Sequence, residues 1–147
     1  MATYKGAAVW LHDSFGEYFF AWLVDRYDGN KEIPSSMQGI VNEAKESLEH
    51  SWIVGILQSF GDRYLKTEDD VSFMLGAMNH LSAELNKDQS KGNIFEFKGH
   101  PIRKDVATEE LAALQRLLTG QITNGMENAE IYTLIAKKWA KPGLNRG

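Results

Sequence analysis

The chain contains no cysteine, which excludes disulfide bonds, thiolate zinc sites and cysteine nucleophiles. Proline is also scarce, with 3 residues in 147, and few prolines favour long uninterrupted helices. Hydrophobic residues (43%) and charged residues (24%) occur at ordinary globular frequencies. A chain of this length buries enough surface to fold without a metal or a disulfide. We therefore expect one domain spanning residues 1–147.

Long apolar runs are missing as well. The run Ala7–Leu11 is too short for a signal-peptide core, and His12 and Asp13 follow it at once. The longest run elsewhere, Trp52–Leu57, is far below the roughly 20 residues that a membrane-spanning helix needs. We therefore expect a cytoplasmic protein with no membrane partner.

Motifs for catalysis and cofactor binding are missing too. Neither the Gly-x-Gly-x-x-Gly pattern nor the Walker phosphate loop occurs. Carboxylate metal bundles need Glu-x-x-His, which is also absent, so a metal-dependent helical bundle around His50 and His80 is only an alternative hypothesis. His12-Asp13 has the composition of an acid–base pair, but helix capping already explains Asp13. We predict no catalytic residue, no cofactor and no metal site.

Several segments carry apolar residues at helical spacing. The first, around Phe15 to Tyr27, is apolar on most sides, which is typical of a central helix used for packing. A second begins near Ser36 and has an apolar stripe opposite a polar face. Residues 51–65 continue a helical period, although Ser51–Leu57 is also compatible with a buried strand.

The second half of the chain starts with a helix signal. Thr67 and Asp70 form a capping-box pattern, with Asp in place of the usual Glu or Gln, and an apolar stripe follows as far as Leu85. Further helices are predicted from Thr108 to Gly120 and over Met126–Ala140. The predicted fold is mainly α, a bundle of five or six helices with one small β-hairpin. That hairpin falls near residues 94–104; a short arm covers residues 1–6 and a basic tail covers residues 141–147.

Charge is distributed unevenly along the chain. Residues 1–90 hold 14 acidic and 7 basic side chains, whereas residues 91–147 hold 6 and 9. An acidic body attracts a basic partner. The candidate partner-binding residues lie on the polar face of the second helix and at the start of the helix that follows Thr67: Glu43, Glu46, Glu49, Asp69 and Asp70.

The predicted function is that of a small acidic non-enzymatic protein that binds and neutralises or regulates a basic protein partner. An immunity protein or another inhibitor of a basic toxin or effector belongs to this class, and the analogy rests on size, charge and compartment. The first alternative is a winged-helix-like nucleic-acid-binding regulator that uses the 94–104 hairpin and the basic C-terminus. A pI of 5.6 disfavours nucleic acid as the partner. A homodimer is compatible with the sequence.

Overall fold

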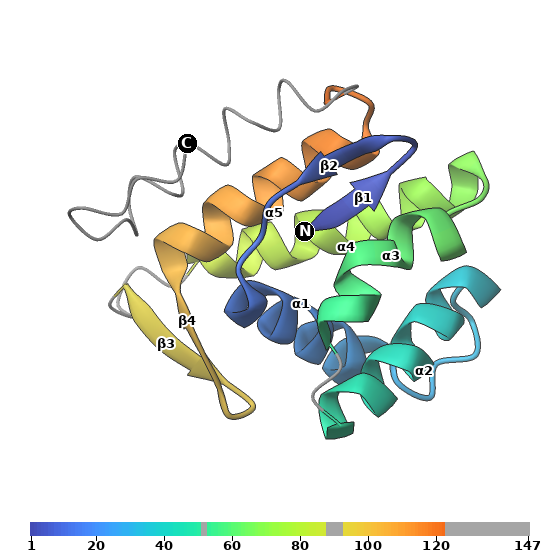
Figure 1. The fold of residues 1–147 in the computed structure, drawn as a ribbon. Coiled ribbons are helices and arrows are strands. Elements are labelled where there is room, and N and C mark those ends of the chain that lie inside the picture. The colour runs from blue at the N-terminus through green and yellow to red at the C-terminus, as the bar shows by residue number, and fades with distance from the viewer. Residues whose placement is uncertain (51–52, 88–92, 123–147) are drawn as a thin grey trace.

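A computed structural model describes residues 1–50, 53–87 and 93–122 of the chain (Figure 1). Within those residues it contains five helices and two antiparallel hairpins. The elements, in chain order, are β1 (Ala2–Tyr4), β2 (Ala7–Val9), α1 (Asp13–Tyr27), α2 (Ser35–His50), α3 (Ile53–Tyr64), α4 (Glu68–Lys87), β3 (Ile94–Phe97), β4 (His100–Arg103) and α5 (Lys104–Leu118). The predicted mainly helical class is confirmed. The predicted helix over 126–140 and the basic tail at 141–147 lie outside the described residues.

Helix α1 is at the centre of the packing. Nine of its 15 residues are buried, and Phe15, Phe19 and Leu23 have no exposed surface. The helix contacts α2, α3, α5 and both strands of the β3–β4 hairpin, as its place in Figure 1 shows. Phe20 meets the ring of Phe60 in α3 edge to face. The prediction of a central helix is therefore confirmed.

Helices α2 and α3 pack beside α1. The predicted stripe of α2 is buried, but the helix begins at Ser35, so Ser36 lies inside it. The Ser36 hydroxyl donates to Asp70 at the start of α4 over 2.7 Å. Helix α3 spans Ile53–Tyr64 and buries one side, which confirms the helical interpretation of those residues over the strand.

The predicted capping box at the start of α4 is present. The Asp70 backbone N–H donates to the Thr67 hydroxyl, and the Thr67 N–H donates to the Asp70 carboxylate, both over 3.1 Å. The Lys66 N–H donates to the same carboxylate. These bonds satisfy backbone amides that a helix start leaves unpaired.

The N-terminal segment differs from the predicted arm. Ala2–Tyr4 pairs with Ala7–Val9, and Lys5 and Gly6 both have positive φ, as a tight two-residue hairpin turn requires. Both strands are largely buried, and β1 packs against α3 and α5. Three-residue strands are too short for an alternating pattern to be recognised, so the sequence indicated only an arm.

The β3–β4 hairpin is where it was predicted, with its turn at residues 98–99. Helix α5, however, begins at Lys104, directly after β4, and not at Thr108. Asn93, the residue directly before β3, caps the start of α5. Its backbone oxygen accepts a hydrogen bond from the Lys104 N–H, and its side-chain oxygen accepts one from the Asp105 N–H. A cap donated across a hairpin leaves no local signal in the sequence.

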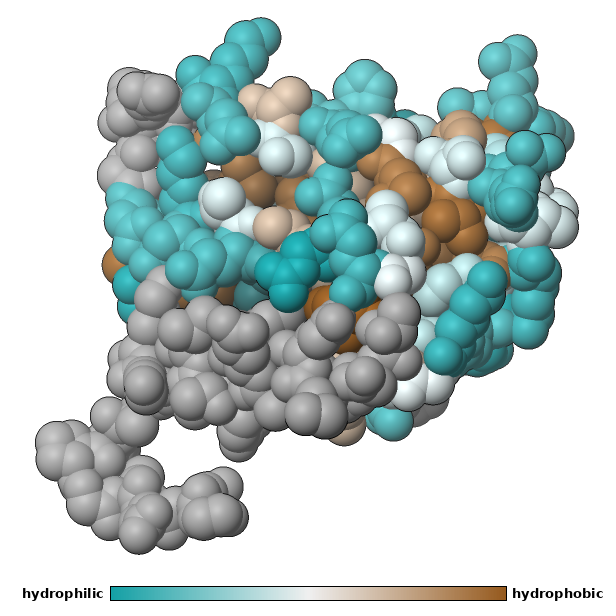
Figure 2. Space-filling view, turned by 90° about the horizontal axis from the view of Figure 1, so that it is seen from above, coloured by the Kyte–Doolittle hydropathy of each residue, from teal (hydrophilic) through white to brown (hydrophobic). Residues whose placement is uncertain are grey.

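The surface of the described residues is mostly hydrophilic. Figure 2 shows one face with hydrophilic side chains outermost and apolar side chains visible between them. The large apolar side chains that are exposed among the described residues are Met1 and Ile94. None of the described helices combines the length and the apolar character that crossing a membrane requires.

Candidate functional site

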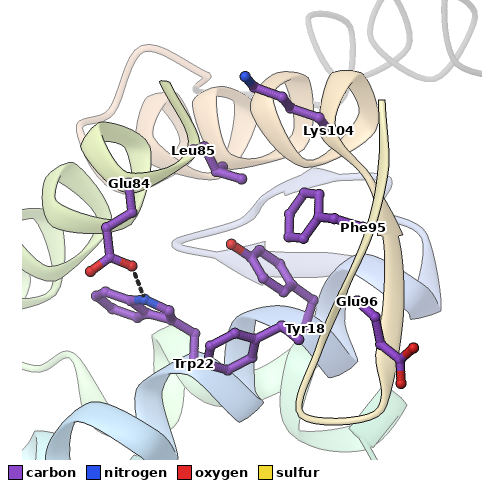
Figure 3. Close-up of a pocket in the computed structure, with 8 residues that line it drawn as sticks. Tyr18, Trp22, Glu84, Leu85, Phe95, Glu96 and Lys104 are labelled. Carbon is purple, nitrogen blue, oxygen red and sulfur yellow. Dashed lines mark hydrogen bonds between the residues drawn. The ribbon is translucent and has the colours of Figure 1, made fainter. Parts of the chain in front are cut away.

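A pocket of about 200 Å³ opens beside α1 (Figure 3). Its walls come from α1, α4, β3 and the first residue of α5. We call it the aromatic pocket; its lining residues are Tyr18, Trp22, Glu84, Leu85, Phe95, Glu96, Phe97 and Lys104. Small-molecule sites usually enclose roughly 300–1,000 Å³. The aromatic pocket therefore has the size for one side chain or one small headgroup.

The regular spacing of aromatic residues explains why they meet here. Tyr18 and Trp22 are four residues apart and share one face of α1. Phe95 and Phe97 are two residues apart and share one face of β3. The Tyr18 ring centroid lies 5.6 Å from that of Phe95 and 5.8 Å from that of Phe97, with the rings nearly perpendicular. These favourable edge-to-face contacts hold the hairpin against α1.

A hydrogen bond between Trp22 and Glu84 joins α1 to α4 at the pocket wall. The indole Nε1–H donates to Glu84 Oε2 over 2.7 Å (Figure 3). The indole is buried, and a buried Trp N–H needs an acceptor. Glu84 itself is exposed, so its carboxylate borders both the pocket and the solvent.

The Tyr18 hydroxyl points into the pocket (Figure 3). Tyr18 is only 3% exposed, and its hydroxyl makes no hydrogen bond with the described part of the chain. Burial, and then the negative charge of Glu84, raise the pKa of Tyr18. The phenol therefore stays protonated and offers one donor and one acceptor to an occupant of the pocket.

The charged side chains that line the pocket differ in their direction relative to the aromatic rings. Figure 3 shows the Glu96 carboxylate and the Lys104 ammonium both directed away from the aromatic rings. Glu84 is directed towards Trp22, so it is the charged group held against the aromatic wall. Of the three charged side chains that line the pocket, two are acidic and one is basic.

The five acidic residues predicted to bind a partner have two different environments. Glu43 binds Arg63 over 2.6 Å and accepts a hydrogen bond from the Tyr64 hydroxyl, and Asp70 caps α4. Both carboxylates are therefore engaged within the chain. The other three are exposed and make no hydrogen bond or ion pair with the rest of the described chain: Glu46, Glu49 and Asp69.

The cations of the β3–β4 hairpin are largely paired by acids of the chain itself. Lys98 lies 3.2 Å from the carboxylate of Asp25, and His100 lies 3.6 Å from that of Glu17. Arg103 binds Asp105 over 2.8 Å. A winged-helix hairpin needs free cations for phosphate contacts, so this pairing weighs against the nucleic-acid alternative.

His50 and His80, the centre of the metal-enzyme alternative, are both exposed. The described residues contain no group of three or more His, Cys, Asp or Glu side chains that could hold a metal ion.

Sequence reasoning missed a buried pair formed by His12 and Glu110. Glu110 is 1% exposed, and its Oε1 accepts from the His12 backbone N–H and contacts His12 Nδ1, both at 2.7 Å. Asp13, the residue first considered as the histidine's partner, is exposed. Glu110 follows Thr108 and Glu109 at the predicted helix start, but it lies one turn before Leu114 on the apolar face of α5. That spacing was the available signal.

Burial disfavours the charged form of both groups in the His12–Glu110 pair. Burial raises the pKa of Glu110 to about 8 and lowers that of His12. The pair joins the junction between β2 and α1 to α5.

No protein-family model, no curated protein and no solved structure matches the chain. The aromatic pocket and the exposed acids are therefore interpreted from their own chemistry.

Proposed function

We propose that this chain is a non-enzymatic binding protein that receives a positively charged group of a protein partner in the aromatic pocket and thereby regulates or neutralises that partner. The observation that carries the proposal is the Tyr18 hydroxyl, which has no hydrogen-bond partner in the described chain and points into a space bordered by aromatic rings and Glu84. Aromatic rings and a carboxylate together stabilise a cation. An apolar occupant would leave the hydroxyl unpaired.

The acidic side of α2 supports a basic partner. Glu46 and Glu49 are exposed on this helix. The neighbouring Lys45 is paired with Asp28, with 3.0 Å between its ammonium nitrogen and the carboxylate. Exposed charge of one sign raises the association rate with an oppositely charged protein more than it raises affinity. These two acids therefore attract the partner, and the pocket holds it.

The chemistry of the pocket favours binding over catalysis. Serine, threonine, cysteine and histidine do not occur among its lining residues. Its phenol is held in the protonated form, which is a poor nucleophile.

Affinity capture from a native lysate of the producing cells tests the proposal. Three forms of the chain are immobilised: the wild type, Glu84→Gln in the pocket and Glu32→Gln, at an exposed residue before α2, as a control with the same charge change. Glutamine at residue 84 can still accept the Trp22 hydrogen bond, so the fold is kept.

We expect the wild type and the control to retain the same protein at one copy per chain. With that protein purified, Glu84→Gln should raise the dissociation constant by about tenfold, the effect of losing one partner of a charge pair. Equal dissociation constants for the wild type and Glu84→Gln would remove the pocket from the interface. Absence of any stoichiometric partner would contradict the binding function itself.

A further inference from the structure

We infer that the group held in the aromatic pocket is the guanidinium of an arginine side chain, an inference that rests on the proposed binding of a positively charged partner. The cavity of about 200 Å³ admits one such side chain. Two features of the pocket distinguish arginine from the other biological cations: the flat aromatic walls and the hydrogen-bond acceptors of two side chains, Glu84 and Tyr18.

The walls suit a planar cation. Four aromatic side chains line the pocket, contributed by α1 and β3: Tyr18, Trp22, Phe95 and Phe97. A guanidinium is planar and weakly hydrated, so it packs against aromatic rings without losing much hydration energy. A lysine ammonium is compact and strongly hydrated, and the rings would have to replace its water.

The acceptors suit a donor with several N–H groups. Glu84 uses Oε2 to accept from Trp22, and its second oxygen has no partner in the described chain. The Tyr18 oxygen also has an open acceptor position. Arginine carries five N–H donors in a fixed plane, which suits acceptors on two different side chains, whereas each ammonium N–H points along a separate direction.

Binding of small blocked amino acids to the full chain tests this inference without the partner. The probes are the N-acetyl methylamides of arginine, lysine and citrulline; citrulline keeps the shape of arginine but replaces the guanidinium by a neutral urea. The readout is the NMR signal of the Trp22 indole N–H, which lies in the pocket wall. A single side chain without its protein context is expected to bind with a dissociation constant on the order of 1 mM.

The arginine probe should shift the Trp22 signal in a saturable way and bind about tenfold more tightly than the lysine or citrulline probe. Tyr18→Phe and Glu84→Gln should each weaken arginine binding, and Glu32→Gln should leave it unchanged. The fold of each variant is checked by its remaining NMR signals.

Three results would overturn the inference. Equal binding of arginine and citrulline would show that the pocket recognises shape without charge. Equal binding of arginine and lysine would show a general cation site. No saturable shift with any probe, combined with a captured partner whose affinity depends on Glu84, would refute arginine while leaving the proposed binding function intact.

Discussion

Glu110 has a carboxylate oxygen, Oε2, that is buried without a hydrogen-bond partner in the described chain. Burial raises the pKa of its carboxyl group from an ordinary 4.5 to about 8. Between these values the folded protein holds a proton that the unfolded chain has released. The free energy of unfolding should therefore fall as pH rises from about 4.5 to about 8, with a slope of up to about 1.4 kcal/mol per pH unit.

His12 acts in the opposite direction because burial lowers its pKa. Below its ordinary value of 6.5 the unfolded chain binds a proton more readily than the folded protein, so His12 reduces stability as pH falls. In the Glu110→Gln variant, only the pH dependence of stability due to His12 remains. Urea unfolding of the variant at several pH values should show no decline up to pH 8. A decline equal to that of the wild type would show that Glu110 ionises normally.

Gly61 lies where β1 crosses α3. A Cβ at this position would sit 3.0 Å from the ring of Tyr4 and 3.2 Å from the backbone oxygen of Thr3. Backbone cannot move aside cheaply, so Gly61→Ala should destabilise the protein by about 1–3 kcal/mol in chemical denaturation. Gly76 in α4 has nothing within 4 Å. Gly76→Ala, the matched control, should stabilise the protein by about 0.5–1 kcal/mol through helix propensity. If both variants changed the free energy of unfolding in the same direction, the close packing of β1 on Gly61 would be contradicted.

At the scale of the element, the start of α4 depends on two reciprocal hydrogen bonds. Thr67→Ala removes the acceptor for the Asp70 N–H and should cost about 1 kcal/mol of unfolding free energy. Asp70→Ala should cost more, because it also removes the bonds from Lys66, Thr67 and Ser36. Asp69→Ala is the comparison, since Asp69 is exposed and has no such bonds. A loss at Asp69 as large as that at Asp70 would mean that helix charge, and not capping, is responsible.

Local signals predicted the elements that depend on local contacts. The apolar stripe of α2, the capping box of α4 and the Lys98-Gly99 turn all lie within one short segment each, and all three were predicted. The start of α5 and the strand character of Ala2–Tyr4 were missed. Both depend on residues distant in the sequence, because Asn93 caps α5 and α3 covers β1.

The aromatic pocket was also beyond sequence reasoning. Tyr18 and Trp22 were correctly predicted on the packed central helix, and aromatic residues there are normally interpreted as core. Glu84 and Phe95 are separated from them by more than 60 positions, so nothing local indicates that the four meet. Of the five predicted acidic residues, three remain available to a partner, because Glu43 binds Arg63 and Asp70 caps α4. The sequence alone does not show these two contacts.

At the scale of the whole molecule, the formal net charge of −4 should govern how fast a basic partner binds. The double reversal Glu46→Lys/Glu49→Lys should lower the association rate constant about tenfold at low salt and leave the dissociation rate constant nearly unchanged. Surface plasmon resonance with the captured partner at two salt concentrations measures both. Glu32→Lys, compared with each single reversal, controls for the overall change in charge. A change confined to the dissociation rate would place α2 inside the contact and not in steering.

The contact between His12 and Glu110 joins residues 98 positions apart, and β1 packs against α5 in the same way. A ribosome makes the chain from its N-terminus, so β1, β2 and α1 leave the exit tunnel long before α5 exists. During that interval the apolar side chains that pack against α5 are uncovered, and folding cannot be completed one element at a time. Chains that end before α5 should therefore aggregate or remain bound to chaperones during synthesis.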